Sequence, residues 1–548
     1  MALNEQLPDP EVSTSRLYQS LSGRVLVVDD ELPNRLYLRK LLETRGCEVF
    51  DADAGPSALA IASKKALDLI LVDVMMPGMD GFELCGRLRD EPRTAGIPVI
   101  MVTAKSRIED IETGFELGAM DYIRKPFNPR ELILRVGNAL ALKKSSDELS
   151  IWNKRVSRDL ELAGAIQRSL FSDVPHFSHR FEVRIAYRTC MDVGGDAFDI
   201  ISLPDGRHCI YVADVSGHGV APAMISSLLK ASASEMIYRY VDQGPAAICN
   251  ALNMMIRRRI DNPAYFATMF MAVHDPQKLE WRCMNCGHPN PIVVRNGNIE
   301  DSSRFSRGGG SPLGFPFGSE RPYSVKDETV FRDDGNTFLL LYTDGLLEAR
   351  HRETAQECGG RVAAVYGQVV QDPSLPNKAM ELLNVLESEG YNLSGDDCTA
   401  ISIHMLDPMK IVLEQTVPRN IYLVSDIARQ AELAAIAQGI SAATGALVRL
   451  LVMELGANLV EHSGMDEVDA FWLQLRVDGN VCQLVLEDEG VEWDLEEALS
   501  RDLDDTYMGE RGRGLAITNT IADRIERYRI QTQNLTYCTI VDEETGHA

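Results

Sequence analysis

Five polar residues in the first quarter of the chain have types and positions that suit phosphoryl transfer. Each lies at or just after the end of a short apolar run: Asp29 and Asp30 after Val25–Val28, Asp73 after Leu69–Val72, Thr103 after Val99–Val102, and Lys125 after Tyr122 and Ile123. Clustered carboxylates repel one another unless a divalent cation lies among them, and oxygen ligands favour Mg²⁺. With that ion in place, Asp73 could attack a phosphoryl group while Lys125 offsets the charge of the transferred oxygens. Thr103 could then hydrogen-bond the phosphorylated product.

Four further aspartates, far apart in sequence, also suit metal chemistry. Asp196, Asp214, Asp344 and Asp396 lie in turn contexts rich in glycine, which lets backbone and metal approach closely. Their separation excludes a local calcium loop, whose ligands lie within about twelve residues. If folding brings them together, they could hold two Mg²⁺ or Mn²⁺ ions roughly 4 Å apart, with a shared water of lowered pKa that attacks phosphorus directly.

A third set of residues suits nucleotide chemistry. Glu454, Asn458 and His462 are four residues apart, so a helix would present them on one face. Asn458 could bind Mg²⁺ through its amide oxygen, and Glu454 could accept a proton from a protein hydroxyl. Downstream, the sequences VLEDEGVEWD and ERGRGLAI supply an acid-glycine turn and a glycine-rich helix entry of the kind that binds phosphates.

The elements that must position these residues change along the chain. Residues 23–144 alternate short apolar runs with helix-like stretches, which predicts a parallel sheet wrapped by helices, with its ligands at the carboxyl ends of the strands. In residues 145–180 the apolar side chains from Leu149 to Leu170 recur every three or four positions, which predicts an amphipathic helix. That stripe must be covered either by its own domains or by its twin in a homodimeric coiled coil. The remaining predicted regions are an N-terminal tail at 1–22, a mixed α/β sandwich at 181–406 with helices near 221–240 and 246–260, and a further α/β unit at 407–548.

Bulk composition narrows the classes of function. The 548 residues predict three to four globular units. A formal charge of -26 disfavours a nucleic-acid partner, which excludes a DNA-binding regulator with a basic recognition helix. The N-terminus lacks the basic region and apolar stretch of a signal peptide. No apolar run is close to the length of a membrane-spanning helix. The number of cysteines, 11, is odd, which suits reduced thiols better than a disulfide framework. We therefore expect a cytoplasmic protein with no membrane segment.

The first region resembles the response-regulator receiver family through LVVDD, DLILVDVMMPGMDGFEL, MVTA and DYIRKPF. The resemblance implies a flavodoxin-like fold with Asp73 as phosphoacceptor and Asp29 and Asp30 as Mg²⁺ ligands. It further implies Thr103 and Lys125 as switch residues and Tyr122 as a moving aromatic. A sensor histidine kinase or a phosphotransfer protein is the implied phosphoryl donor.

The region 181–406 resembles the sporulation- and stress-regulator branch of the metal-dependent serine/threonine phosphatases through GGDAFD, DVSGHG, NCGHPNP, YTDG and GDDCT. The resemblance implies an α/β/β/α sandwich in which Asp196 and Asp214 bridge two metals, the backbone carbonyl of Val215 adds a ligand, and Asp344 and Asp396 complete the second ion. The implied substrate is a phosphoserine or phosphothreonine on a protein, often the antagonist of an anti-sigma factor.

The region 407–548 resembles the GHKL ATPase fold in its anti-sigma serine-kinase form. The resemblance implies Asp488 as the adenine-binding acid, Gly490 in the first glycine box, Gly512 and Gly514 in the nucleotide lid, and Mg²⁺ with ATP as ligands. Glu492 stands where the family usually has a second glycine, and a carboxylate there would repel nucleotide.

Two hypotheses follow for this multidomain α/β protein. In the first, receiver phosphorylation controls a phosphatase whose C-terminal serine kinase opposes it on one antagonist protein, as in a partner switch. In the second, the C-terminal domain is a non-catalytic module that sequesters the antagonist or a sigma factor. Nucleotide binding separates the two.

Overall fold

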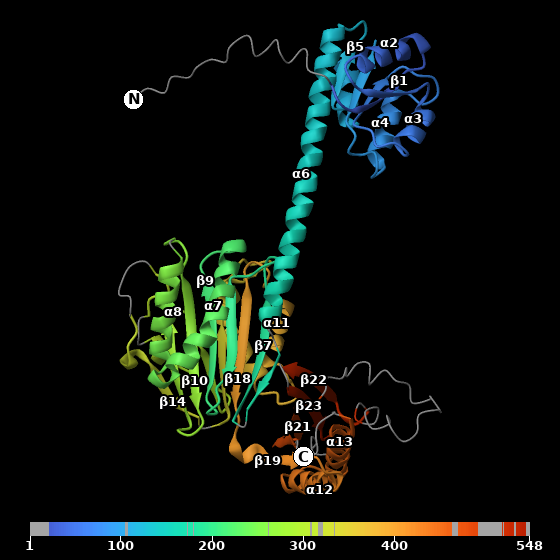
Figure 1. Cartoon of the computed structure of the whole chain (residues 1–548). Coiled ribbons are helices and arrows are strands. Elements are labelled where there is room, and N and C mark those ends of the chain that lie inside the picture. The colour runs from blue at the N-terminus through green and yellow to red at the C-terminus, as the bar shows by residue number, and fades with distance from the viewer. Residues whose placement is uncertain are drawn as a thin grey trace, which may run out of the picture. The chain divides into compact units, whose positions relative to one another are not determined.

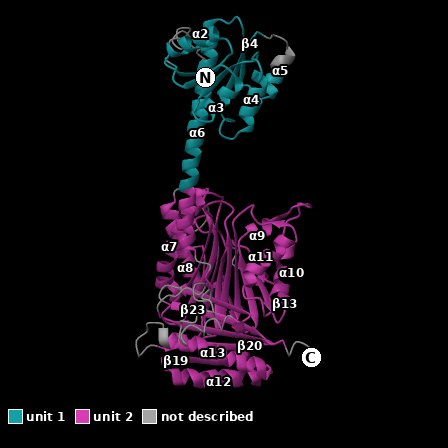
Figure 2. Cartoon of the chain, turned by 90° about the vertical axis from the view of Figure 1, so that its right-hand side faces the viewer, with its two compact units in different colours: residues 1–159 teal, residues 160–548 magenta. Residues whose placement is uncertain are grey.

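The computed structural model describes residues 21–104, 108–171, 174–178, 180–260, 262–306, 310–315, 322–333, 335–462, 470–490, 518, 520–530 and 533–543. The chain divides into two compact units, residues 1–159 and 160–548, which are coloured separately in Figure 2. The division falls inside the predicted linker. Each unit is described below by itself.

The first unit contains a five-stranded parallel sheet with strand order β2-β1-β3-β4-β5, which is the flavodoxin-like order. Apolar strand residues are buried on both faces because helices cover both sides of the sheet. Its elements are β1 (Arg24–Val28), α2 (Leu32–Glu43), β2 (Glu48–Ala52), α3 (Gly55–Ala62), β3 (Leu69–Asp73), α4 (Gly81–Asp90), β4 (Val99–Thr103), α5 (Ile108–Glu116) and β5 (Asp121–Arg124).

A single helix, α6 (Pro129–Leu170), contains both the last helix of the predicted 23–144 region and the predicted linker helix (Figure 1). It begins at a proline, which is tolerated in a first helical turn, and no further proline occurs before residue 171. Leu132, Val136 and Leu140 near its start join the receiver core, whereas several apolar side chains in its middle are exposed. The predicted helix is thus confirmed, and it starts earlier than the apolar stripe alone indicated.

The second unit begins with two antiparallel sheets packed face to face. One has the order β14-β11-β10-β9-β8 and the other β13-β12-β15-β18-β7-β6. The strands are β6 (His176–Phe177), β7 (Phe181–Arg188), β8 (Asp196–Ser202), β9 (His208–Val215), β10 (Ala267–Asp275), β11 (Glu280–Cys286), β12 (Ile292–Arg295), β13 (Asn298–Glu300), β14 (Thr329–Arg332), β15 (Thr337–Tyr342) and β18 (Cys398–Met405). A short pair, β16 (Arg350–His351) and β17 (Tyr391–Asn392), lies outside the two sheets.

Helices cover both outer faces of this sandwich, as Figure 2 shows. The larger core joins the inner sheet faces to α7 and α8, and a second core joins the other sheet to α10 and α11. The helices are α7 (Val220–Tyr240), α8 (Pro245–Arg259), α9 (Gly345–Glu348), α10 (Gly359–Val369) and α11 (Lys378–Ser388). The predicted α/β/β/α arrangement is confirmed, as are the two helices expected near 221–240 and 246–260.

A third sheet, with order β19-β20-β21-β23-β22, completes the second unit, and two helices pack on one of its faces. The elements are β19 (Ile411–Pro418), α12 (Ile421–Ala437), α13 (Ala442–His462), β20 (Ala470–Asp478), β21 (Val481–Asp488), β22 (Arg524–Ile530) and β23 (Gln533–Val541). Within the described residues, α13 is the one helix whose length and apolarity would suffice to cross a bilayer. Its buried side chains Val448, Leu451 and Leu455 belong to the core of this sheet, which accounts for that apolarity.

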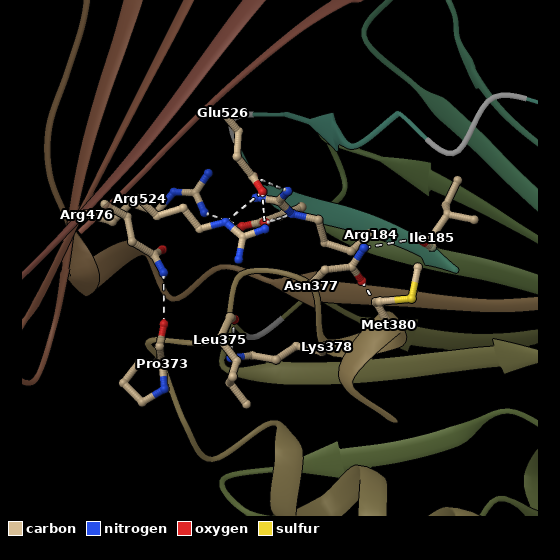
Figure 3. A network of polar contacts seen from close by, with 12 residues as sticks. Arg184, Ile185, Pro373, Leu375, Asn377, Lys378, Met380, Arg476, Arg524 and Glu526 are labelled. Atoms are coloured by element: carbon tan, nitrogen blue, oxygen red, sulfur yellow. Dashed lines mark hydrogen bonds and ion pairs between the residues drawn. The ribbon is translucent and has the colours of Figure 1, made fainter. Parts of the chain in front are cut away.

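The other face of the third sheet meets the sandwich through a buried ion cluster. We call Glu182, Arg184, Arg476 and Glu526 the interdomain cluster. Figure 3 labels Arg184, Arg476 and Glu526. The Arg184 guanidinium lies 2.5 Å from Glu182 and 3.1 Å from Glu526, and Arg476 lies 2.9 Å from Glu182. Arg184 also lies over the ring of Tyr537, 4.5 Å from its centroid. Strands from the two sheets are therefore joined by charges that are each paired.

Candidate functional site

In the first unit the structure brings together the acids at the carboxyl ends of neighbouring strands. Carboxylate oxygens of Asp29, Asp30 and Asp73 lie within 4.8 Å of one another, Asp29 and Asp73 being buried and Asp30 exposed. The Lys125 ammonium donates to Asp29 over 2.7 Å and to Asp73 over 2.6 Å. Thr103 is buried at the end of β4, the strand next to β3, which ends at Asp73.

Lys125 compensates part of this negative charge. Burial alone would lower the pKa of Lys125, but hydrogen bonds to Asp29 and Asp73 raise it overall. Three carboxylates against one ammonium still leave net negative charge, so the donor set fits a hard divalent cation. Asn34 was not foreseen in this pocket, although its side chain donates to Asp29 over 3.2 Å.

In the second unit the aspartates of two adjacent strands face each other. Asp196 begins β8 and pairs directly with Asp214 on β9. One Asp196 oxygen accepts hydrogen bonds from Thr399 at 2.5 Å and Thr343 at 2.9 Å. The other oxygen, Oδ1, is buried and has no hydrogen-bond partner within the described part of the chain. Burying an ionised oxygen without a hydrogen-bond partner costs free energy, so Oδ1 is suited to bind a cation.

Three more acids approach from turns that precede other elements. Asp344 is the N-cap of α9, and Asp396 and Asp397 come just before β18. Asp397 accepts from the backbone N–H of Cys190 at 2.8 Å and of Gly195 at 2.6 Å. It therefore fixes the loop that leads into Asp196.

Two glycines allow this close packing. A Cβ on Gly345 would lie 2.1 Å from the Asp397 carbonyl oxygen, so only glycine fits after Asp344. A Cβ on Gly195 would lie 3.1 Å from the carbonyl oxygen of Val215, the predicted backbone ligand. The glycines that adjoin the acids in sequence thus allow backbone segments to meet at the site.

The five acids Asp196, Asp214, Asp344, Asp396 and Asp397 are called the acid cluster below. Burial and repulsion from Asp344, Asp396 and Asp397 raise the pKa of Asp214 to about 7. Burial and the neighbouring Asp214 raise the pKa of Asp196 well above its ordinary value, and burial with Glu348 and Asp396 nearby raises that of Asp344. No lysine or arginine of the described residues forms an ion pair with any of the five.

This arrangement fits the expected divalent ions. Several oxygen donors converge, one of them is an orphaned buried oxygen, and the accumulated negative charge has no cationic partner among the described side chains. The four predicted acids from distant segments therefore lie at one site.

Some residues of this site were missed from sequence. Asp397, Thr343 and Thr399 hold the acids and their loop. All three lie inside the motifs YTDG and GDDCT, but no role was predicted for them. Gln167, near the end of α6, accepts from the Gly194 N–H at 2.9 Å and donates to its carbonyl at 2.7 Å. Because Gly194 is two residues before Asp196, α6 is joined to the acid cluster by these two hydrogen bonds.

The predicted nucleotide residues of the third sheet are only partly brought together. Asp488 ends β21 and accepts from the Gly490 N–H at 2.9 Å, from Asn534 at 2.7 Å and from Arg527 at 3.2 Å. Glu454 and Asn458 lie on α13, and the Asn458 side-chain nitrogen is buried without a partner in the described structure. No hydrogen bond or ion pair among the described residues links them to Asp488. Gly512, Gly514 and Glu492 lie outside the described residues.

This donor set fits ATP less well than the acid cluster fits metals. An adenine-binding acid must accept from the nucleotide, but Asp488 is only 2% exposed, and its Oδ1 already accepts two hydrogen bonds from the protein and its Oδ2 one. The Asn458 side-chain nitrogen has no hydrogen-bond partner among the described residues, whereas Mg²⁺ would bind the amide oxygen.

Comparisons with known proteins match three successive segments. Residues 25–137 match the response regulator receiver domain, residues 204–406 the stage II sporulation protein E family, and residues 417–540 the histidine kinase-like ATPase domain. The response regulator PleD of Caulobacter vibrioides is 42% identical over 148 residues, which are 27% of this chain and 33% of that protein. The transcriptional regulatory protein ResD of Bacillus subtilis is 42% identical over 135 residues, which are 25% of this chain and 54% of that protein. The chain thus spans a third to about half the length of these relatives.

Two solved structures resemble the second unit's domain types. The RsbU and RsbW domains of Rv1364c from Mycobacterium tuberculosis are 20% identical with a TM-score of 0.37, covering 66% of this chain and 93% of that one. The SiaA-PP2C domain of Pseudomonas aeruginosa is 20% identical with a TM-score of 0.39, covering 46% of this chain and 98% of that one. At these scores neither likeness carries an argument.

Proposed function

We propose that this chain is a metal-dependent protein phosphoserine/phosphothreonine phosphatase controlled by its receiver. Its sequence matches a response-regulator receiver domain, a SpoIIE-type domain and a histidine-kinase-like ATPase domain, in that order. The proposed domains are residues 23–144, 181–406 and 407–548, with a linker at 145–180. The observation that carries the proposal is the acid cluster, whose buried charge has no cationic partner among the described residues.

The side chains of the acid cluster have distinct proposed roles. Asp196 and Asp214, which face each other across β8 and β9, would bridge two divalent ions, with the Val215 carbonyl as a further ligand. Asp344 and Asp396 would complete the second ion. Two Mg²⁺ or Mn²⁺ ions bound there would supply Lewis acidity and a water of lowered pKa. Thr343 and Thr399 orient Asp196 through its Oδ2 atom, which leaves Oδ1 for a ligand.

Helix α6 offers a route from receiver to phosphatase. We propose Asp73 as the phosphoacceptor, with Asp29 and Asp30 as Mg²⁺ ligands and Thr103, Lys125 and Tyr122 responding to the phosphoryl group. The two hydrogen bonds between Gln167 and Gly194 would transmit a change in α6 to the loop before Asp196.

The exposed middle of α6 supports a homodimer as part of this proposal. Trp152 is 62% exposed and Leu149 is 60% exposed, although both are apolar. A second copy would cover them in a coiled coil.

The remaining partners follow from the domain types. A sensor histidine kinase or phosphotransfer protein would phosphorylate Asp73, and the antagonist of an anti-sigma factor would be the substrate. All of these would meet the protein in the cytoplasm, without nucleic acid or membrane.

For the C-terminal domain two functions are proposed. In one, it is an ATP- and Mg²⁺-dependent serine kinase that opposes the phosphatase, with Glu454 as base, Asn458 on the metal, and Asp488, Gly490, Gly512 and Gly514 around the nucleotide. In the other, it is a non-catalytic module that binds the antagonist or a sigma factor. The hydrogen bonds that Asn534, Gly490 and Arg527 already make to Asp488 favour the second.

The phosphatase is tested with the full chain, Mn²⁺ and a phosphoserine-bearing antagonist protein. We expect the wild type to release phosphate and Asp344→Asn to release none. Asp301→Asn, which changes an exposed acid of the same domain, should keep the activity. Beryllofluoride on Asp73 should alter the rate of release. No release by any form of the protein would overturn the enzymatic proposal. Binding of a fluorescent ATP analogue, lost in Asn458→Ala, would in turn decide for the kinase.

A further inference from the structure

Two cysteines lie beside the acid cluster. Cys398, which follows Asp397, is buried and its thiol donates to the Leu393 carbonyl at 3.5 Å, which leaves Cys190 as the accessible thiol. Cys190 is in the loop between β7 and β8, and it is partly exposed, whereas the other ten cysteines of the chain are buried. Its sulfur and one carboxylate oxygen each of Asp396 and Asp397 lie within 4.8 Å of one another. A thiol therefore faces two of the acids in the proposed phosphatase site.

The three donors differ in chemical character. Carboxylate oxygens suit Mg²⁺ and Mn²⁺, whereas a thiolate selects softer ions such as Zn²⁺. Ligands of a tetrahedral zinc with sulfur and oxygen donors lie roughly 3.5 Å apart, so these side chains need to close by about 1 Å. Side-chain rotation can supply that movement, because Cys190 is partly exposed and in a loop.

A second observation points to a cation at the same place. The Asp196 side chain is 1% exposed, and its Oδ1 atom has no hydrogen-bond partner in the described structure. Asp397 accepts from the backbone N–H of Gly195 at 2.6 Å, and Gly195 directly precedes Asp196, so the two acids belong to one region. The thiol thus adds a soft donor to a region that already lacks positive charge.

We propose that Cys190, Asp396 and Asp397 form a site for a thiophilic divalent cation, of which Zn²⁺ is the common example. On binding, the sulfur forms a bond to the cation and the thiol proton passes to solvent, while water completes the coordination. The Asp397 oxygens keep lone pairs for the cation even while they accept from the Cys190 and Gly195 amides.

The site shares Asp396 with the proposed catalytic metals, and this consequence rests on the proposed function. A zinc ion held by Cys190 would withdraw Asp396 from the second catalytic ion. Zn²⁺ would then inhibit the phosphatase in the presence of saturating Mn²⁺. The binding itself does not depend on the phosphatase activity.

Absorption of the Co²⁺-loaded full chain tests the binding. Co²⁺ replaces Zn²⁺ as the probe because a cobalt–thiolate bond gives a charge-transfer band in the near ultraviolet. We expect the band in the wild type and its displacement by added Zn²⁺. Cys190→Ser should lose the band, whereas Cys482→Ser, which changes a buried thiol on β21 of the third sheet, should keep it. A second variant, Cys190→Asp, keeps a ligand at the position and should bind Co²⁺ without the band.

The outcomes separate this proposal from the proposed function. Absence of the band in the wild type, or its persistence in both Cys190 variants, would overturn the thiol site. If no variant releases phosphate but the band follows Cys190, the phosphatase proposal fails and the cation site stands. In an active protein, we expect the Zn²⁺ concentration for half-inhibition to rise at least about tenfold in Cys190→Ser, consistent with the loss of one zinc ligand.

Discussion

The second unit buries charge in two places with opposite electrostatics. In the interdomain cluster, burial alone would raise the pKa of Glu182, but attraction to Arg184 and Arg476 lowers it to about 2. In the acid cluster, burial and repulsion raise the pKa of Asp214 to about 7. Glu182 is 6% exposed and Asp214 is only half-buried, so the depth of burial does not explain the two directions; the difference lies in whether each charge has a partner.

This difference separates a structural charge cluster from a binding site. The interdomain cluster satisfies its own charges, so it needs no ligand and holds the third sheet against the sandwich. The acid cluster leaves charge unbalanced, so it is stable only when protonated or when cations are bound. Breaking each cluster should therefore have different consequences.

The largest expected effect is on the interdomain cluster. Arg184→Ala would leave Glu182 and Glu526 buried with fewer partners and remove the contact with Tyr537. Losing one member of a buried ion pair costs about 3–5 kcal/mol. We expect the urea transition of the second unit, followed by tryptophan fluorescence, to shift to lower urea by a corresponding amount.

The matched control is Arg524→Ala. Arg524 also pairs with Glu526, but its side chain is 49% exposed. Exposed pairs contribute at most about 1 kcal/mol, so this transition should hardly move. Equal shifts for the two variants would show that the interdomain cluster is not held by buried charge.

Gly345→Ala should disturb the acid cluster through the backbone. The added Cβ would lie 2.1 Å from the Asp397 carbonyl, so the turn after Asp344 must move. Such overpacking costs about 1–3 kcal/mol, and we expect Mn²⁺ affinity, measured by calorimetry, to fall at least about tenfold. Gly360→Ala is the control, because no atom lies within 4 Å of its added Cβ. Unchanged Mn²⁺ binding in Gly345→Ala would show that the acids do not depend on this close approach.

The metal-free protein should lose stability as pH rises. The pKa of Asp214 moves from 3.8 to about 7 on folding, so between these values the folded state keeps a proton that the unfolded state has lost. Stability must then fall as pH rises from about 4 to about 7 and level off above, by up to about 4 kcal/mol, because each pKa unit corresponds to about 1.4 kcal/mol. Urea transitions across this range in EDTA measure the slope.

Two comparisons sharpen this pH prediction. Asp214→Asn should flatten the slope, because the amide does not titrate. Added Mn²⁺ should reverse it, because the cation replaces the proton. A slope that is unchanged in Asp214→Asn would assign the effect to other groups.

Much of the fold could be predicted from local patterns. The receiver strands are short apolar runs that end in polar residues, and α7 and α8 follow helical periodicity, so each carries its own signal. Asp196, Asp344 and Asp396 carried a signal because glycine adjoins each of them, and Asp214 because the turn SGHG begins two residues later. Their convergence, by contrast, depends on strand order across two sheets, which local sequence does not encode.

The residues that join domains carried no sequence signal. Arg184 and Glu526 are 342 positions apart, and each resembles an ordinary charged residue on the solvent face of a strand. Gln167 likewise resembles any polar residue of an exposed helix. Their partners lie on other elements, so only the folded chain shows what they do.

The smallest expected stability effect tests the link between α6 and the acid cluster. Gln167→Leu removes two hydrogen bonds to Gly194 and leaves a buried N–H and carbonyl without that partner. We expect the free energy of unfolding of the second unit to fall by about 1–3 kcal/mol. If α6 transmits the receiver state, phosphate release by this variant should also no longer respond to beryllofluoride. Ser169→Ala, an exposed change on the same helix, should keep both the stability and the response. A full beryllofluoride response in Gln167→Leu would place the coupling elsewhere, because the only side-chain link from α6 to the loop before Asp196 among the described residues would then be dispensable.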